Sequence, residues 1–352
     1  MAAYMNSQGD PVTVVAKGSE DQLKKTVEDT GISVAPGDEV TYTIKQQYLY
    51  IAPNADPKTF TISDTITNGT IDMDSLLVGY ANTAEGQVAE TLTPVSRENP
   101  DGDYAVSSVT TPDVGITGFT LDFGGDCYDS SLAGKTLVIT YKVVVGNLSE
   151  ADVTTVSNRA SSSNGTGQIV ETKPVSFKVT KVDSEKQNET LGGAEFTIYK
   201  EVPEAIEDVT TTITYNEQVK NVIIVDTITT ASEGALKGTA TISNLDAQAT
   251  YYVKETNAPT GYSLNDEVFK LERPDQDEPV IDTDTWKNGD VTYNKTTYTY
   301  ANFNDITVDD TKLASLPSTG GIGTTIFTIG GCAIMIAAAA LYFVNRRKSE
   351  EN

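Results

Sequence analysis

Val175-Ser176-Phe177-Lys178-Val179-Thr180-Lys181 alternates apolar and polar side chains, and this alternation decides how the chain folds. Side chains at every second position of a β-strand point to the same face, so the stretch predicts a strand with one face in a core. The buried phase runs through positions 175, 177 and 179 and then falls on Lys181. Burying an isolated ammonium is costly, so this lysine must be neutralised, paired or chemically consumed.

Further polar side chains take the buried phase in the same region. Tyr251-Tyr-Val253-Lys-Glu255 turns Glu255 inward, and Tyr298-Thr-Tyr300-Ala-Asn302 turns Asn302 inward, with Asn304 in the same phase. Desolvation lowers the pKa of a lysine and raises that of a glutamate, which leaves a neutral amine and a protonated acid. Attack of Lys181 on the Asn302 amide, with loss of ammonia, gives an intramolecular isopeptide bond. A buried salt bridge between Lys181 and Glu255, beside a hydrogen-bonded asparagine, fits the same spacing.

Three segments of this region resemble the Cna protein B-type domain. They are Lys181-Val182-Asp183, Leu191-Gly-Gly-Ala194-Glu-Phe196 and Tyr252-Val-Lys-Glu255-Thr-Asn-Ala258-Pro259-Thr-Gly261-Tyr262, the last of which is similar to the pilin E-box. The resemblance covers nearly all of residues 173–308 and implies a small β-sandwich, to which we assign residues 171–308. It also implies a Lys181–Asn302 bond promoted by Glu255, with Asn304 as the alternative partner.

Polar side chains take the buried phase in the N-terminal region as well. They occur in Leu23-Lys-Lys25-Thr-Val27, Phe60-Thr-Ile62-Ser-Asp64-Thr-Ile66 and Val156-Ser-Asn158-Arg-Ala160, whereas Lys24 takes the outward phase. Segments 34–44, 61–65 and 134–145 resemble the isopeptide-forming fimbrial domain of backbone pilins. For residues 21–170 the resemblance implies a β-sandwich with a bond between Lys25 and Asn158 and with Asp64 as catalytic acid. The alternative is a capped strand end at Asp64 and an exposed Asn158.

The C-terminal tail has three parts in a fixed order. Residues 322–344 contain no charged side chain, and as a helix they would span about 34 Å, enough for a bilayer core of about 30 Å. A basic tail, 345–352, follows and holds that end in the cytoplasm. An ordinary membrane anchor has these two features. The residues upstream complete a resemblance to the cell-wall sorting signal of Gram-positive surface proteins: Leu316, Pro317, Ser318, Thr319 and Gly320.

The sorting signal implies how the chain is processed. A sortase is expected to cleave between Thr319 and Gly320 and to pass the Thr319 carbonyl to an amine of peptidoglycan or of a neighbouring pilin subunit. The span at 322–344 is then a transient membrane anchor. We assign residues 309–352 to this signal and expect a secreted protein attached to the cell wall.

Residues 1–20 lack the basic segment and apolar core of a secretory signal. Val12-Thr-Val14-Val15-Ala16-Lys17-Gly18 lies where backbone pilins carry a Val-x-Val-Tyr-Pro-Lys-Asn motif, with several of its positions changed. The resemblance implies that Lys17 joins subunits and that residues 1–20 are the last strand of a missing N-terminal domain. An exposed lysine beside a strand is an equal alternative.

Composition excludes several function classes. The chain has 50 acidic and 25 basic residues, a net charge of −25, so nucleic acid is a poor partner. It has no histidine, which removes the usual general base and the commonest zinc ligand. We predict no enzyme activity beyond a single-turnover bond, no cofactor and no metal site, since the acidic residues at 275–284 lack calcium-loop spacing. We predict no disulfide between Cys127 and Cys332.

The predicted architecture is all-β, with tandem immunoglobulin-like β-sandwich domains followed by one C-terminal transmembrane helix. Threonine, valine, isoleucine and tyrosine are plentiful, and turn dipeptides separate the runs, as in strand-and-hairpin proteins. The predicted function is structural: a pilin subunit anchored or polymerised by sortase and stiffened by isopeptide bonds. The alternative is a monomeric wall-anchored adhesin, in which the domains form a stalk and a missing N-terminal domain binds a host ligand.

Overall fold

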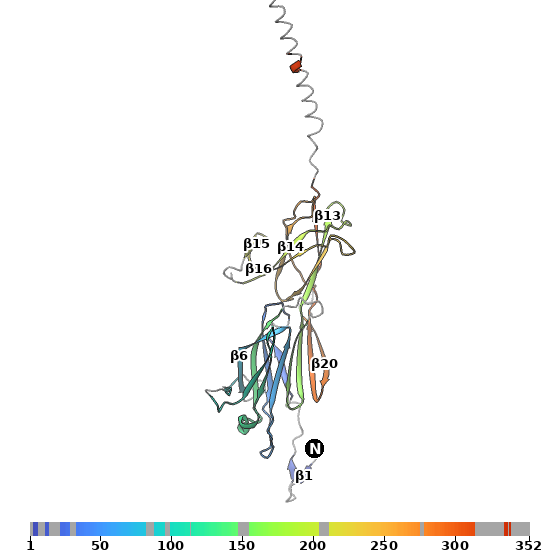
Figure 1. Cartoon of the computed structure of the whole chain (residues 1–352). Helices are drawn as coiled ribbons and strands as arrows, with labels where there is room; N and C mark the ends of the chain where they lie inside the picture. The colour runs from blue at the N-terminus through green and yellow to red at the C-terminus, as the bar shows by residue number, and fades with distance from the viewer. Residues whose placement is uncertain are drawn as a thin grey trace, which may run out of the picture.

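The computed structural model describes residues 3–5, 11–13, 22–28, 33–81, 88–95, 99–112, 114–146, 155–203, 211–274, 278–313, 334–336 and 338. Nearly all regular structure within these residues is β-strand, in agreement with the predicted all-β class. Two domains lie one above the other along the long axis of the molecule (Figure 1). Ahead of them, β1 (Ala3–Met5) and β2 (Pro11–Thr13) pair as a separate two-stranded sheet.

The first domain is a sandwich of two sheets. The five-stranded sheet has the order β3 (Lys24–Val27), β4 (Glu39–Gln47), β10 (Thr136–Val145), β6 (Gly69–Ala81) and β7 (Glu90–Thr91). The seven-stranded sheet has the order β20 (Val280–Asn288), β21 (Val291–Thr299), β12 (Thr166–Lys173), β11 (Val156–Ser162), β5 (Thr61–Thr67), β9 (Gly115–Asp122) and β8 (Ala105–Thr111). Two short 3₁₀ turns, Gly125–Cys127 and Ser130–Leu132, follow β9.

The core of the first domain forms because strands of both sheets turn every second side chain toward the space between the sheets. Along β4 the buried side chains include Val40, Tyr42 and Ile44, and along β11 they include those at positions 156, 158 and 160. Large aromatic rings fill the space between the sheets and contact one another edge-on or tilted; they are Tyr48, Phe60, Tyr104, Phe119, Phe123 and Tyr141. The phase that buries these rings also places Lys25, Asp64 and Asn158 inside.

The second domain is a smaller sandwich built around the strand that contains residues 175–181. That stretch begins β13 (Val175–Asp183), which lies between β17 (Thr239–Leu245) and β22 (Ile306–Asp310). The opposing sheet has the order β15 (Thr211–Tyr215), β16 (Gln218–Thr229), β14 (Glu195–Glu201), β18 (Tyr251–Asn257) and β19 (Val268–Lys270). Its core includes Phe177, Val179, Phe196, Tyr251 and Val253.

A hairpin from the second half of the chain belongs to the sheet of the first domain. The strands β20 and β21 come after β19 in sequence, yet β21 pairs in parallel with β12, with Gly167 opposite Tyr293. The Tyr293 ring covers this glycine, because a Cβ at Gly167 would lie 2.5 Å from the ring. The predicted division at residue 170 separates the two cores, but residues 280–299 of the predicted second domain extend the first domain (Figure 1).

The two domains also touch where the chain crosses between them. Only Pro174 separates β12 from β13. The backbone N–H of Ala247 donates to the buried Ser33 hydroxyl at 2.7 Å, and Lys200 forms an ion pair with Asp38 at 2.9 Å. Together with the hairpin, these contacts connect the domains at several points that are far apart in sequence.

No helix among the described residues is long and apolar enough to cross a membrane. Of the predicted span at 322–344, the structure describes only residues 334–336 and 338, which are helical. The predicted transmembrane helix therefore falls almost entirely outside the described residues.

The Tyr293→Ala variant should loosen the hairpin from β12. It removes a side chain that is only 5% exposed and covers Gly167, so we expect a loss of about 2 kcal/mol or more in unfolding free energy. Urea unfolding measures the loss, and the emission of Trp286, the only tryptophan, reports the local change because its ring lies 5.3 Å from that of Tyr293. Val280→Ala, at an exposed position of the same hairpin, is the control. Unchanged stability and emission in Tyr293→Ala would contradict this anchoring.

Candidate functional site

The first domain encloses a cluster made by four strands. Lys25 on β3 donates hydrogen bonds to Asp64 on β5 and, at 2.6 Å, to the hydroxyl of Tyr141 on β10. The side-chain amide of Asn158 on β11 donates to the same hydroxyl at 3.0 Å. All four residues are buried, so the predicted alternative of an exposed Asn158 and a capping Asp64 does not match their positions. The amine and the amide therefore meet through one hydroxyl group.

Burial sets the protonation of this cluster. It lowers the pKa of Lys25 to about 8, although Asp64 acts in the opposite direction. It also raises the pKa of Asp64, against the opposing effects of Lys25 and of a hydrogen bond from Tyr141. Both shifts favour the neutral forms, an amine with a free lone pair and a protonated acid. These are the forms that attack of an amine on an amide requires.

The second domain encloses a lysine between two carboxylates. Lys181 on β13 lies 2.5 Å from Asp310 on β22 and 3.0 Å from Glu255 on β18, and none of the three side chains is accessible to solvent. The other Glu255 oxygen accepts a hydrogen bond from the backbone N–H of Asn265 at 2.8 Å. Burial raises the pKa of Glu255 against these hydrogen bonds, and the Asp310 carboxylate adds to the rise. When two carboxyl groups lie beside one amine, repulsion between their negative charges favours a proton on one of them.

The predicted partner of Lys181 needs correction. Asn302 and Asn304 are exposed, and the Asn302 side chain accepts a hydrogen bond from the backbone of Ser176 instead. The reason is a break in the strand: β21 ends at residue 299 and β22 begins at residue 306, so the alternation does not continue through the asparagines. Within β22, Val308 lies opposite Lys181, and Asp310, in the phase of Val308, enters the core.

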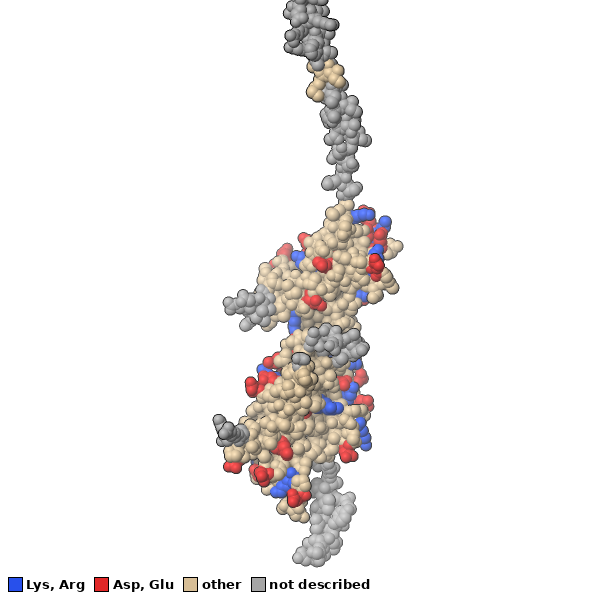
Figure 2. All heavy atoms as spheres, viewed as in Figure 1, with Lys and Arg blue, Asp and Glu red and all other residues tan. Residues whose placement is uncertain are grey.

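The remaining predicted residues lie outside these clusters. Lys17 and the sorting signal at 316–320 fall outside the described residues, as does Cys332; Cys127 is a free thiol. Within the part of the chain that the structure describes, no group of three or more acidic, histidine or cysteine side chains is placed to hold a metal ion. Acidic and basic side chains are interspersed over the visible face of both domains (Figure 2). Lys25 and Lys181 are set apart from these exposed lysines by complete burial.

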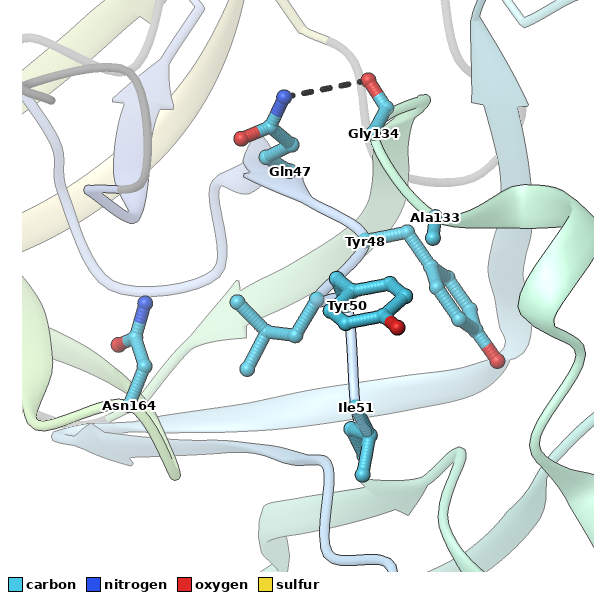
Figure 3. A pocket seen from close by; sticks show the side chains of 8 residues that line it. Gln47, Tyr48, Tyr50, Ile51, Ala133, Gly134 and Asn164 are labelled. Atoms are coloured by element: carbon cyan, nitrogen blue, oxygen red, sulfur yellow. Dashed lines mark hydrogen bonds between the residues drawn. The ribbon is translucent and has the colours of Figure 1, made fainter. Parts of the chain in front are cut away.

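A hollow at one end of the first domain is chemically different from the two clusters. It has a volume of about 540 Å³ and is lined by Gln47, Tyr48, Leu49, Tyr50, Ile51, Ala133, Gly134 and Asn164. Figure 3 shows the Tyr48 and Tyr50 rings on this lining, with one hydrogen bond from the Gln47 amide to the carbonyl of Gly134. None of the lining side chains carries a formal charge, in contrast to the lysines and carboxyl groups of the two buried clusters.

Comparison with known proteins finds matches in two segments of the chain and along most of its length. Residues 175–289 match the prealbumin-like fold domain SpaA, and residues 308–351 match the LPXTG cell wall anchor motif. The trypsin-resistant surface T6 protein of Streptococcus pyogenes serotype M6 is 26% identical over an alignment that covers 96% of this chain and 71% of that protein. The two matched segments define a sortase-anchored surface protein of Gram-positive type.

Solved structures support the same fold. The pilus 2b backbone protein of group B streptococcus has a TM-score of 0.53 and 22% identity, covering 84% of this chain and 99% of that one. The T6 backbone pilin of S. pyogenes has a TM-score of 0.50 and 18% identity, covering 83% and 70%. The chain is thus similar in fold to these two pilus backbone proteins and similar in sequence to the T6 surface protein along nearly its whole length.

The lowered pKa of Lys25 has a consequence for stability when the lysine stays free, as in an Asn158→Ala variant. The folded-state pKa of about 8 lies below the ordinary 10.5, so the unfolded chain binds more protons between these values and stability rises with pH there. From pH 8 to 10 we expect a gain of about 2 kcal/mol relative to the same variant with Lys25→Met, measured by urea unfolding. Lys24→Met should leave the pH dependence as it is. If the difference in unfolding free energy between the two variants stays constant from pH 8 to 10, the lowered pKa of Lys25 is wrong.

Proposed function

We propose that this protein is a structural pilin subunit in which each domain closes an internal isopeptide bond and a sortase joins the chain to its neighbours or to the wall. The observation that carries the proposal is the complete burial of Lys25 and Lys181, each in contact with a carboxyl group. A buried ammonium paired with a carboxylate contributes little net stability, whereas an amide needs no solvation of charge. Each bond forms once and without turnover.

In the first domain the bond joins Lys25 to Asn158. The neutral amine of Lys25 attacks the side-chain carbonyl carbon of Asn158, the carbon–nitrogen bond of the amide breaks, and ammonia leaves. Asp64 in its protonated form polarises the amide and stabilises the charge that develops on the carbonyl oxygen. The buried Asn158 oxygen has no hydrogen-bond partner in the described part of the chain, so it is open to such a donor.

In the second domain the bond joins Lys181 to Asp310. The amine attacks the Asp310 carboxyl carbon, a carbon–oxygen bond breaks, and water leaves. Glu255 takes the proton that the amine loses and supplies one to the departing oxygen, because it contacts Lys181 at 3.0 Å and burial keeps its pKa high. This assignment replaces Asn302 with Asp310 and keeps the promoting role of Glu255.

Intact-mass measurement tests both bonds. The folded chain should weigh less than its sequence by one ammonia and one water. Lys25→Met should restore the ammonia only, and Lys181→Met or Glu255→Ala the water only; Lys24→Met, which removes the exposed neighbouring lysine, should change neither loss. Each bond closes a loop of more than a hundred residues, so by analogy with a disulfide we expect its absence to cost about 2–4 kcal/mol. A chain with the full sequence mass would falsify both assignments.

Assembly depends on the C-terminal signal. We propose that sortase cleaves after Thr319, that the span at 322–344 is released, and that the Thr319 acyl group passes to an amine of peptidoglycan or of another subunit. The match of residues 308–351 to the cell wall anchor motif supports this processing. Lys17 is the proposed acceptor in the next subunit, because it precedes the first domain in the place of the backbone-pilin lysine.

Tryptic peptides of wall-released protein distinguish polymerisation from simple anchoring. We expect a branched peptide in which Thr319 is amide-linked to a lysine side chain, with Lys17→Arg abolishing the branch and Lys24→Arg leaving it intact. A branch at another lysine would identify a different acceptor residue and would still support polymerisation. Thr319 attached only to peptidoglycan fragments rejects the polymer and favours a monomeric wall-anchored adhesin with a host ligand.

A further inference from the structure

Tyr141 contacts both nitrogen atoms of the first-domain reaction. Its hydroxyl oxygen lies 2.6 Å from the Lys25 amine and 3.0 Å from the Asn158 amide nitrogen. Asp64 contacts Lys25 directly, whereas the hydrogen bond described for the Asn158 amide nitrogen goes to Tyr141. The hydroxyl therefore bridges the attacking nitrogen and the leaving nitrogen.

The reaction requires a proton to move between these two nitrogens. The Lys25 amine must lose one proton when it becomes an amide, and the Asn158 nitrogen must gain one to leave as ammonia. The side chains that surround them are buried, so solvent has no direct access to the transfer. A group that can accept and donate a proton at once, in contact with both nitrogens, meets this need.

We propose that Tyr141 is a catalytic proton relay for the Lys25–Asn158 bond, which rests on the bond formation proposed above. After Lys25 attacks the carbonyl carbon, the Asn158 nitrogen becomes pyramidal, because its lone pair is no longer delocalised into the carbonyl group. The Tyr141 hydroxyl gives its proton to that nitrogen and takes one from the Lys25 nitrogen. The carbon–nitrogen bond breaks, ammonia leaves, and the tyrosine ends in its starting form, so no other proton source is consumed.

The surroundings of Tyr141 fit a relay more than a permanent base. Its ring stacks on Tyr42 with 6.0 Å between centroids and meets the edge of Phe119 at 5.1 Å, which fixes the direction of the hydroxyl. Burial raises the pKa of Tyr141 well above its ordinary value, so a free tyrosinate does not accumulate. Asp64 accepts a hydrogen bond from the hydroxyl and stabilises it as the proton moves.

The chain contains two controls for this role. Tyr42 is also fully buried in the same core, but its hydroxyl has no hydrogen-bond partner among the described residues. Tyr42→Phe thus removes a buried hydroxyl without touching the reacting atoms. In the second domain Lys181 contacts the carboxylates of Glu255 and Asp310 directly, so its bond should form without a tyrosine.

The test follows bond formation in time. The full chain is synthesised in a cell-free system, samples are quenched in acid urea, and the tryptic peptides that join Lys25 to Asn158 and Lys181 to Asp310 are quantified. For Tyr141→Phe we expect the first bond to form about a hundredfold more slowly, the size of a typical acid–base contribution, with the second bond unchanged. Tyr42→Phe should form both bonds at the unmodified rate.

The outcomes separate the relay from the bond itself. If the unmodified chain forms the first bond and Tyr141→Phe forms it at the same rate, the relay is wrong and the bond stands. If the unmodified chain never forms it, the bond assignment fails and the relay with it. A loss of fold is tested in an Asn158→Ala background, where neither variant can link: Tyr141→Phe should still unfold in one cooperative urea transition, at a lower midpoint than Tyr42→Phe because only the Tyr141 hydroxyl is hydrogen-bonded, to Lys25 and Asp64. Loss of the cooperative transition in Tyr141→Phe, together with a slowed second bond, overturns the relay.

Discussion

A lysine amine sealed inside a β-sandwich constrains everything around it. Water cannot solvate the charge, so the surrounding strands must supply either a counter-charge or an electrophile in direct contact. Both domains meet this constraint, with Lys25 and Lys181 each fully buried against at least one carboxyl group. The packing has to hold those groups in reach before any bond forms, which explains why large rings such as Tyr141 and Phe196 lie beside the two amines.

The two domains satisfy the constraint with different geometry. In the first, Lys25 and Asn158 belong to opposite sheets, so a bond between them would tie the sandwich across its core. In the second, Lys181 and Asp310 lie on neighbouring parallel strands of one sheet, so a bond would join the first and last strands of that domain. The leaving groups differ as well, because one partner is an amide and the other a carboxylic acid. The shared feature is the buried amine beside an acid.

The alternation of side chains could predict the inward direction of Lys25, Asp64, Lys181 and Glu255, because each lies inside a regular strand. It failed at Asn302, where the chain leaves β21 and the period of two no longer holds. The position of β20 and β21 could not be predicted either. Every residue of β20 is exposed, so no apolar face marks it, and its partner β21 pairs with β12, more than a hundred residues earlier. Periodicity describes single strands and does not specify which distant strands meet.

The hairpin of β20 and β21 would also affect how the protein responds to a pulling force applied at its two ends. With the proposed bonds in place, tension would pass from Lys25 to Asn158, along the backbone to Lys181, and across to Asp310. The loops 26–157 and 182–309 would carry no load, and the only stretch of backbone under tension between the bonds would contain β12. Tension would separate β11 from β12 one residue pair at a time, starting at the open end of the hairpin that they form. The backbone hydrogen bonds between β12 and β21 would resist this separation, because β21 lies in an unloaded loop and holds β12, which belongs to the loaded stretch of backbone.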